Sequence, residues 1–207
     1  MVVLSYSSLY LLHNHPHCWL NKQMGIQQED TAAFREGKEG HKIIQSHLCG
    51  KEENPNLSHI TYKFPVVEEK DFDERTKFWL QLNKDFALIG YADGLNPEQK
   101  TLLEIKLSSS PWSLSKFQKA IQRKIYSLGF PWVEEAVLVT GQRLPDKWES
   151  EPIKYFTVNM TDADRKEAKD YIKQGIEIFK SGNFTRDLVE GRCTDFRCPW
   201  GRNCYFK

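Results

Sequence analysis

The chain lacks the features that would place it outside the ordinary globular proteins. None of its apolar runs approaches the roughly 18 to 20 residues that span a bilayer, and it has no internal repeat and no low-complexity segment. Its hydrophobic fraction of 40% is ordinary for a chain that builds a core. These observations argue against a membrane-spanning, fibrous or disordered protein, and 207 residues suit one domain.

The chain also lacks an excess of either charge. Lys and Arg together number 29, and Asp and Glu number 28. The net charge therefore gives no electrostatic argument for nucleic acid as a partner. Any contact with DNA has to come from a local patch of basic residues.

The N-terminal segment MVVLSYSSLYLL is apolar but lacks two parts of a secretory signal. No Lys or Arg precedes the apolar residues, and HNHPHCW follows them in place of a small-residue cleavage site. We therefore expect a soluble, cytoplasmic protein with no membrane partner.

The apolar pattern predicts an α/β fold with a mixed central β-sheet flanked by helices. Helices are expected over residues 6–14, over residues 31–49 despite Gly37 and Gly40, after SSSPWS, and from Thr161 to Gly182. Strands are expected at HITYKF, TKFWLQL, FALIGYA, TLLEIKL, EAVLVT and IKYFTVNM, with a hairpin turn at NKD.

Three charged residues stand on two of the expected strands. Asp93 ends the apolar run FALIGYA, and Glu104 and Lys106 are two apart in TLLEIKL. On a strand, Glu104 and Lys106 point to the same face. An acidic and a basic residue at this spacing are common on exposed strands, but this strand is otherwise apolar, so solvation at the surface does not readily explain them.

This set of side chains suits the hydrolysis of phosphodiester bonds. Asp93 and Glu104 would hold Mg²⁺ or Mn²⁺, with the carbonyl of Ile105 as a candidate further ligand. Lys106 would orient or deprotonate the attacking water and offset negative charge. We therefore predict a divalent-metal site where the two strands meet.

The helix after this strand carries a second set of candidate residues. Gln122 and Tyr126 are four apart and share a helix face, where an amide can hold a phosphate or a carboxylate and a tyrosine can contact a base or a phosphate. Four basic residues form a candidate nucleic-acid patch on or near this helix, although a solvated helix face explains them equally well: Lys116, Lys119, Arg123 and Lys124.

Taken together, GYAD, EIK and QRKIY resemble the PD-(D/E)XK nuclease superfamily, and specifically its RecB-like branch, in which a Gln-x-x-x-Tyr motif follows the Glu-x-Lys strand. The resemblance implies a restriction-endonuclease-like core and a divalent-metal-dependent deoxyribonuclease. It also implies that a histidine on an earlier helix joins the metal site, and the matching position is His41 in GKEGHKII. That assignment rests on the order of motifs in the family.

Three of the five cysteines close the chain in CTDFRCPWGRNC. In an intracellular protein, clustered cysteines favour a metal over disulfides, and a fourth thiolate has to come from Cys18 or Cys49. The segment SYSSLYLLHNHPHCW resembles the N-terminal part of RecB-like nucleases with a 4Fe-4S cluster, such as the CRISPR-associated adaptation exonucleases and the AddB-type nucleases. The resemblance implies Cys18, Cys193, Cys198 and Cys204 as cluster ligands. Cys49 is then left over, and we expect it to be a free buried thiol.

Two features depart from that family's pattern. Four residues separate Cys193 from Cys198 where two are common, and Trp19 follows Cys18 where proline is usual. Zn²⁺ therefore remains an alternative to the cluster, since three histidines precede Cys18: His13, His15 and His17. Thiols without a metal in an irregular tail are a further alternative.

We expect a single nuclease domain over residues 1–207, with a core at about residues 31–182 and cysteine-bearing ends at about 5–20 and 183–207. The resemblance implies an exonuclease that acts on DNA ends or single-stranded DNA, in CRISPR spacer acquisition or in DNA recombination and repair, with nuclease, integrase or helicase subunits as partners. The alternatives are a structure-specific or restriction-type endonuclease of the same superfamily, and a catalytically inactive DNA-binding or assembly subunit.

Overall fold

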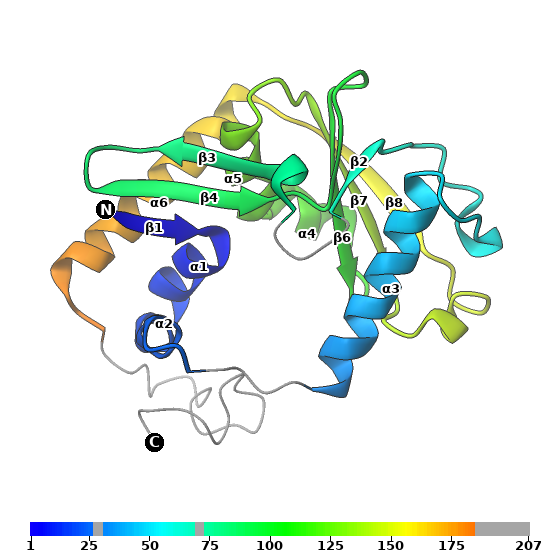
Figure 1. The fold of residues 1–207 in the computed structure, drawn as a ribbon, viewed down its shortest axis with the longest axis horizontal. Helices are drawn as coiled ribbons and strands as arrows, with labels where there is room; N and C mark the ends of the chain where they lie inside the picture. The colour runs from blue at the N-terminus through cyan, green and yellow to red at the C-terminus, as the bar shows by residue number, and fades with distance from the viewer. Residues whose placement is uncertain (27–30, 69–72, 185–207) are drawn as a thin grey trace.

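The described part of the chain is a mixed α/β fold in which helices pack against two sheets (Figure 1). The computed structural model describes residues 1–26, 31–68 and 73–184. The smaller sheet consists of β1 (Val2–Ser5), β3 (Lys77–Gln81) and β4 (Phe86–Tyr91) in the order β1-β4-β3. β4 pairs in parallel with β1 and antiparallel with β3.

The larger sheet contains the strand that carries Glu104 and Lys106. Its order is β2-β5-β6-β7-β8, and the parallel pair among them is β6 with β7. The strands are β2 (Val66–Val67), β5 (Gly94–Asn96), β6 (Thr101–Leu107), β7 (Glu135–Gly141) and β8 (Lys154–Asn159). The fold class predicted from the sequence is confirmed, and its strands are divided between two sheets.

The described helices lie before, between and after these strands. They are α1 (Tyr6–Asn14), α2 (Pro16–Gln23), α3 (Ala32–Leu48), α4 (Leu114–Lys119), α5 (Ile121–Gly129) and α6 (Asp162–Ser181), with 3-10 turns at Pro55–Leu57, Glu74–Thr76 and Pro145–Lys147. The helices expected near 6–14, 31–49 and 161–182 are thereby confirmed. β1 and α2 were not predicted.

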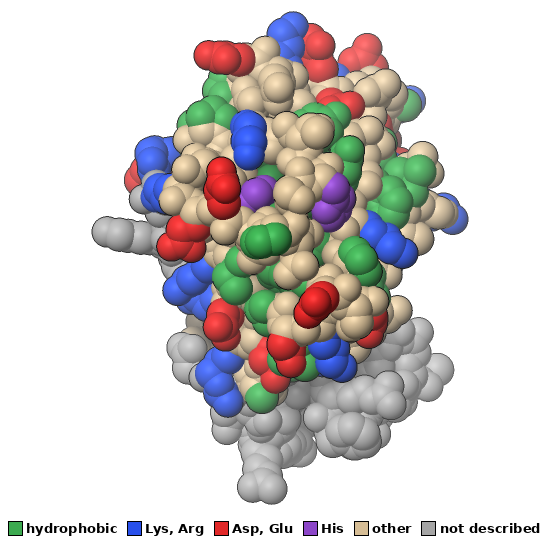
Figure 2. Space-filling model, turned by 90° about the vertical axis from the view of Figure 1, so that its right-hand side faces the viewer, with side chains coloured by type: hydrophobic (Ala, Val, Ile, Leu, Met, Phe, Trp, Pro, Cys, Tyr) green, Lys and Arg blue, Asp and Glu red, His purple; other side chains and the backbone are tan. Residues whose placement is uncertain are grey.

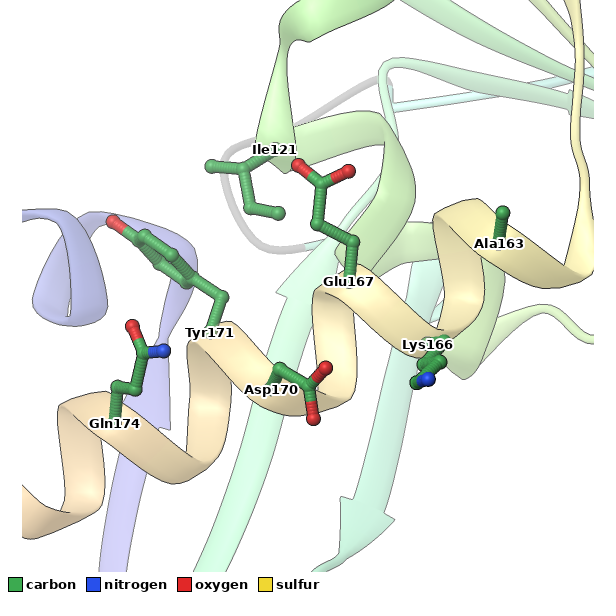
Figure 3. A pocket seen from close by; sticks show the side chains of 7 residues that line it. All are labelled: Ile121, Ala163, Lys166, Glu167, Asp170, Tyr171 and Gln174. Atoms are coloured by element: carbon green, nitrogen blue, oxygen red, sulfur yellow. The ribbon is translucent and has the colours of Figure 1, made fainter.

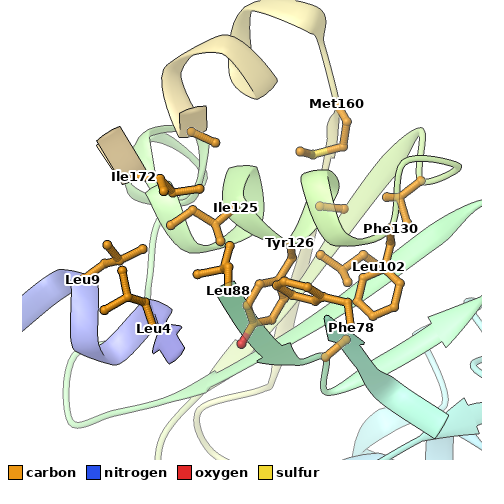
Figure 4. Close-up of a cluster of buried hydrophobic side chains, with 14 of the residues drawn as sticks. Leu4, Leu9, Phe78, Leu88, Leu102, Ile125, Tyr126, Phe130, Met160 and Ile172 are labelled. Atoms are coloured by element: carbon orange, nitrogen blue, oxygen red, sulfur yellow. The ribbon is translucent and has the colours of Figure 1, made fainter. Parts of the chain in front are cut away.

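Strand β6 lies between two apolar cores. The first core contains side chains of the smaller sheet, α1, α5 and α6, with Leu88, Ile125 and Ile172 among its members (Figure 4). The second core contains α3, β7 and the opposite face of β6, with Leu103 and Ile105 buried in it. Because side chains alternate along a strand, Glu104 and Lys106 share the face of Leu102, which is the face of the first core.

The segment HITYKF was expected to be a strand, and this prediction is wrong. The burial alternates as it would on a strand, with Ile60 and Phe64 buried, Tyr62 half-buried and the residues between them exposed, yet the segment forms no strand. Its backbone bonds are made elsewhere: the Phe64 N–H donates to the Leu48 carbonyl, and the Asn96 amide donates to the Lys63 carbonyl. The end of α3 and a buried asparagine therefore replace a neighbouring strand.

The helix expected after SSSPWS is broken at Ala120 into α4 and α5. Arg123 is buried, and its guanidinium donates to the carbonyls of Phe117 and Gln118. In a continuous helix those carbonyls would accept from the next turn of backbone N–H groups. The arginine thus satisfies the end of α4 and allows α5 to start in a new direction.

Ion pairs join α5 to α6. Arg123 donates to Asp164 at 3.1 Å, and Lys124 lies 2.6 Å from Glu167 and 3.4 Å from Asp164. Asp164 also accepts from Thr161 in the capping box at the start of α6. These contacts hold the pKa of Asp164 below its ordinary value although burial opposes this.

We predict that Asp164→Asn lowers the free energy of unfolding by about 2 kcal/mol at neutral pH, because it leaves the buried Arg123 without its counter-charge. The depressed pKa of Asp164 means that its contribution is present above the unfolded value of 3.8 and is lost as the pH falls through the lower folded value. The deficit of the variant should therefore shrink below pH 3.8. Urea unfolding at several pH values measures this.

The matched control is Asp170→Asn, an exposed aspartate two turns further along α6. It should change the free energy of unfolding by less than about 0.5 kcal/mol. Equal destabilisation by both substitutions would show that the pairing with Arg123 does not stabilise the helix contact.

Candidate active site

Asp93 lies where the chain passes from the smaller sheet to the larger one, between β4 and β5. The β5–β6 register pairs Gly94 with Leu103, which sets Asp93 beside Glu104. The side-chain carboxylate of Asp93 accepts a hydrogen bond from the Ile105 N–H at 2.6 Å. The backbone carbonyl of Asp93 accepts one from the Gln45 side-chain amide at 2.9 Å. The aspartate is therefore fixed to β6 and to α3 at once.

His41 approaches this carboxylate from α3. Its Nε2 lies 3.3 Å from Asp93 Oδ2. The preceding Gly40 permits the approach, since a Cβ there would lie 2.6 Å from Leu107 and 3.2 Å from the Arg143 carbonyl. Gln45, one turn after His41 on the same helix face, was missed by the sequence reasoning, and the spacing of four was its signal.

The charges of the pair His41 and Asp93 support one another. Burial opposes the charged form of His41, but the facing Asp93 carboxylate outweighs it and raises the pKa of the imidazole. Burial likewise opposes the charge on Asp93, yet His41 and Lys106 keep its pKa below the ordinary value.

Glu104 is a buried carboxylate with few partners. Its side chain is 2% exposed, and Oε1 is in direct ion-pair contact with Lys106 Nζ. Among the described residues, neither oxygen accepts a hydrogen bond of ordinary geometry. Burial raises the pKa of Glu104 to about 7, while the Lys106 ammonium opposes this rise. The lone pairs of this carboxylate are therefore available to a further cation.

Lys106 connects Glu104 to the helix α5. Its Nζ donates to Gln122 Oε1 at 3.0 Å, and Gln122 Nε2 donates to the Tyr126 hydroxyl at 3.3 Å. Burial opposes the charge on Lys106, but Glu104 and Asp93 raise its pKa above the ordinary value. Burial raises the pKa of Tyr126, so that its hydroxyl stays neutral.

The structure thus brings the predicted residues of α3, the β4–β5 link, β6 and α5 into one cluster: His41, Asp93, Glu104, Ile105, Lys106, Gln122 and Tyr126. Tyr126 reaches it beside Gly90, where a Cβ would lie 3.1 Å from its ring. The small side chain on β4 therefore leaves room for the tyrosine.

The donor atoms of this cluster suit Mg²⁺ or Mn²⁺, which prefer carboxylate and carbonyl oxygens with an occasional imidazole. The His41–Asp93 contact at 3.3 Å brings an imidazole nitrogen and a carboxylate oxygen together. Within the described residues, no three His, Cys, Asp or Glu side chains form a group able to hold a metal. Glu104 faces Lys106 instead, so a cation would compete with this lysine.

The structure divides the predicted basic patch. Lys116 and Lys119 are exposed. Arg123 and Lys124 are buried and paired with Asp164 and Glu167, so they join α5 to α6 and do not face solvent. On the side of the molecule that carries α3, acidic and basic side chains are interspersed (Figure 2).

A groove of about 420 Å³ runs along α6 beside Ile121 (Figure 3). Its charged lining consists of Lys166, Glu167 and Asp170, which is two carboxylates against one ammonium. Such a lining disfavours a phosphate backbone. We therefore do not assign this groove to a nucleic-acid substrate.

Cys18 lies on α2 and is buried, whereas Cys193, Cys198 and Cys204 lie outside the described residues. The neighbouring Trp19 ring contacts Phe179 and Phe184, each at a centroid distance of 5.2 Å. The described chain therefore ends close to the segment that carries Cys18.

His13, one of the histidines of the zinc alternative, and Cys49 both make other contacts. The His13 Nε2–H donates a hydrogen bond to the Tyr171 carbonyl at 2.9 Å, and the imidazole ring stacks on the Tyr171 ring. Cys49, expected to be a buried thiol, is half-buried at the end of α3, where its Sγ donates to the Ser46 carbonyl.

Comparison with known proteins identifies similar folds. No family model matches the chain, and no curated protein matches it. An alkaline exonuclease from Laribacter hongkongensis, LHK-Exo, superposes with a TM-score of 0.51 at 16% identity, covering 86% of this chain and 88% of the exonuclease. The same exonuclease in complex with dAMP has a TM-score of 0.50 at 16% identity and the same coverage. SSO0001 has a TM-score of 0.50 at 16% identity, with 85% and 76% covered.

These likenesses define the class of fold. The chain shares a mixed α/β, restriction-endonuclease-like architecture with an alkaline exonuclease, as the sequence motifs predicted. Within residues 1–26, 31–68 and 73–184, none of the helices has the length and apolar character of a membrane span.

We predict that Mn²⁺ raises the midpoint of thermal unfolding by roughly 5 to 10 °C at about 100 times its Kd. Asp93→Asn should abolish most of this shift. Lys106→Met should lower the midpoint without metal, because Glu104 loses its counter-charge, and should enlarge the shift with Mn²⁺, because the competing cation is gone. Differential scanning calorimetry with and without Mn²⁺ measures both effects.

The control is Asp85→Asn, an exposed aspartate in the β3–β4 turn. It should show the wild-type response to Mn²⁺. A shift of equal size in wild type and Asp93→Asn would place the metal elsewhere.

Proposed function

We propose that this chain is a divalent-metal-dependent DNA nuclease. The observation that carries the proposal is the buried Glu104 carboxylate, which has no ordinary hydrogen-bond donor among the described residues and lies between Lys106 and the pair of Asp93 with His41. A carboxylate is expensive to bury, and its removal from water is explained when it holds a cation. The likeness in fold to an exonuclease is consistent with this role.

In the proposed reaction, Asp93, Glu104, His41 and the Ile105 carbonyl would hold Mg²⁺ or Mn²⁺, which would supply an activated water and neutralise charge on the phosphate. Lys106 orients or deprotonates the attacking water and offsets the charge that develops on the phosphate oxygens.

Gln122 acts in this reaction as a positioning residue. It accepts a hydrogen bond from Lys106 and donates one to the Tyr126 hydroxyl, so it fixes the direction of the ammonium group. Tyr126, a buried member of the first core, closes this chain of contacts and holds the Gln122 amide in place.

We further propose that the substrate is a DNA end or a single strand and that the enzyme is an exonuclease. One structural neighbour is described as an alkaline exonuclease and was solved in complex with dAMP. The process is CRISPR spacer acquisition or DNA recombination and repair, alongside integrase, helicase or other nuclease subunits, as the sequence resemblance implies. An endonuclease of the same superfamily is the second candidate, and an inactive DNA-binding subunit is the third.

We predict that the protein with Mn²⁺ shortens linear single-stranded DNA progressively from one end and leaves a circular single strand intact. Asp93→Asn and Lys106→Met should each reduce the rate at least about a hundredfold. Linear substrates labelled at either end, resolved on a denaturing gel, show the direction of digestion.

Lys154→Met, which removes an exposed lysine of β8, is the control and should retain the wild-type rate. Cleavage of the circle would favour the endonuclease. If neither form of DNA is degraded, or if Asp93→Asn has full activity, the proposed activity is wrong.

We propose that the described parts belong to one domain over residues 1–207 and that a 4Fe-4S cluster on Cys18, Cys193, Cys198 and Cys204 joins its ends. What supports this is the packing of Trp19, next to Cys18, against Phe179 and Phe184 at the end of the described chain. This packing brings Phe184, the last described residue, close to the helix that carries Cys18.

We predict that anaerobically purified protein is brown and contains iron and acid-labile sulfide. Cys18→Ser should lose the colour and lower the unfolding temperature, because a cluster ligand is removed. Cys49→Ser, at a half-buried thiol that donates to the Ser46 carbonyl, should keep both. If the purified protein is colourless and contains stoichiometric zinc, the 4Fe-4S proposal is wrong and the Zn²⁺ alternative is favoured.

A further inference from the structure

Trp112 lies in the link between β6 and α4 and is tied to the backbone of Lys106. The backbone N–H of Trp112 donates to Thr140 Oγ1 at 3.0 Å, and the Thr140 hydroxyl donates to the backbone carbonyl of Lys106 at 2.8 Å. Thr140 is buried on β7, opposite Lys106 in the parallel register. One hydroxyl group therefore fixes the position of Trp112 relative to the candidate catalytic lysine.

The indole ring of Trp112 lies near two ammonium groups. Lys116 Nζ is 4.4 Å from the ring centroid, and Lys106 Nζ is 5.9 Å from it. These distances lie within the range of cation–π attraction. The aromatic side chain thus stands between the cluster of Glu104 and Lys106 and the exposed start of α4.

Lys116 differs from the buried cations of α5. It is exposed, and no acidic side chain among the described residues pairs with its ammonium group. Arg123 and Lys124, in contrast, are bound to carboxylates of α6. Lys116 can therefore leave the indole ring for a phosphate at no cost in ion pairs.

A half-buried tryptophan beside an exposed lysine has the chemistry that binds one nucleotide of a single strand. The aromatic face stacks on a base of any sequence, and the ammonium group contacts the adjacent phosphate. The position beside Lys106 would place that nucleotide next to the phosphodiester bond that is cleaved.

We propose that Trp112 and Lys116 form a nucleotide-binding subsite for single-stranded DNA at the edge of the active site, in which Trp112 stacks on a base and Lys116 binds the neighbouring phosphate. The inference rests on the proposed nuclease function and deepens it. It implies that an unpaired base is required there, since a base within a duplex has no free face to offer an aromatic side chain.

The test measures binding of full-length protein to a short fluorescent oligothymidylate in EDTA, so that no hydrolysis occurs. Single abasic sites are placed in turn along the oligonucleotide. For wild type, one abasic position should weaken binding about tenfold. Trp112→Leu, which keeps an apolar side chain against the first core, should bind the intact strand about tenfold more weakly and show no further loss at that abasic position.

Trp112→Phe should restore most of the affinity, because it restores an aromatic face. Trp79→Leu, at an exposed tryptophan of β3, is the matched control and should bind as wild type does. With Mn²⁺ and saturating DNA, Trp112→Leu should keep its kcat within about threefold while KM rises. Circular dichroism confirms that each variant is folded.

If the abasic site weakens binding by the same factor in Trp112→Leu as in wild type, the two losses of affinity are independent and the proposed stacking is wrong. A fall in kcat with unchanged affinity would also overturn it and would make Trp112 a positioning residue for Lys106. If wild type neither binds nor degrades DNA, the proposed nuclease function is wrong and this inference is wrong with it. The two preceding outcomes, in contrast, overturn the stacking and leave the nuclease function standing.

Discussion

The burial of Glu104 in the middle of β6 is the constraint on which the rest of the structure depends. An isolated carboxylate at 2% exposure costs several kcal/mol, and the nearest compensation is a single ammonium group, that of Lys106. An apolar residue would fill the same place between the two cores at lower cost. The proposed cation site accounts for a charged pair at this position, which the apolar packing around β6 does not require.

The surrounding elements place three further groups around that pair. Gly40 allows α3 to approach β6, so that His41 reaches Asp93, and the passage of the chain between the two sheets leaves Asp93 beside the end of the short β5. On the other side, the break between α4 and α5 lets Gln122 meet Lys106. The contact of His41 with Asp93 joins positions 52 residues apart in the sequence, so the site is complete only when α3 packs against β6.

The sequence predicted the parts of the site that follow from local periodicity. Glu104 and Lys106 share a strand face, and Gln122 and Tyr126 share a helix face, because spacings of two and four have these consequences in regular structure. His41 was placed by resemblance alone, since no local pattern reveals that its helix crosses the sheet at Gly40. The strand expected at HITYKF failed because its polar backbone is satisfied by Leu48 and Asn96, which are contacts that no alternation of residues reveals.

The spacing of residues along the helix also could not show whether the side chains of Arg123 and Lys124 are exposed or buried. Both look like members of a basic helix face, but each finds a carboxylate on α6, a helix that begins some forty residues later. Their burial changes the electrostatics of the proposed substrate complex. The chain has no excess of charge, and two of the four basic residues predicted for the patch are committed to α6. The patch therefore offers fewer phosphate contacts, and less counterion release, than the sequence predicted. In the proposed complex, an unpaired base that stacks on an aromatic side chain beside the active site would add binding energy that does not depend on phosphates.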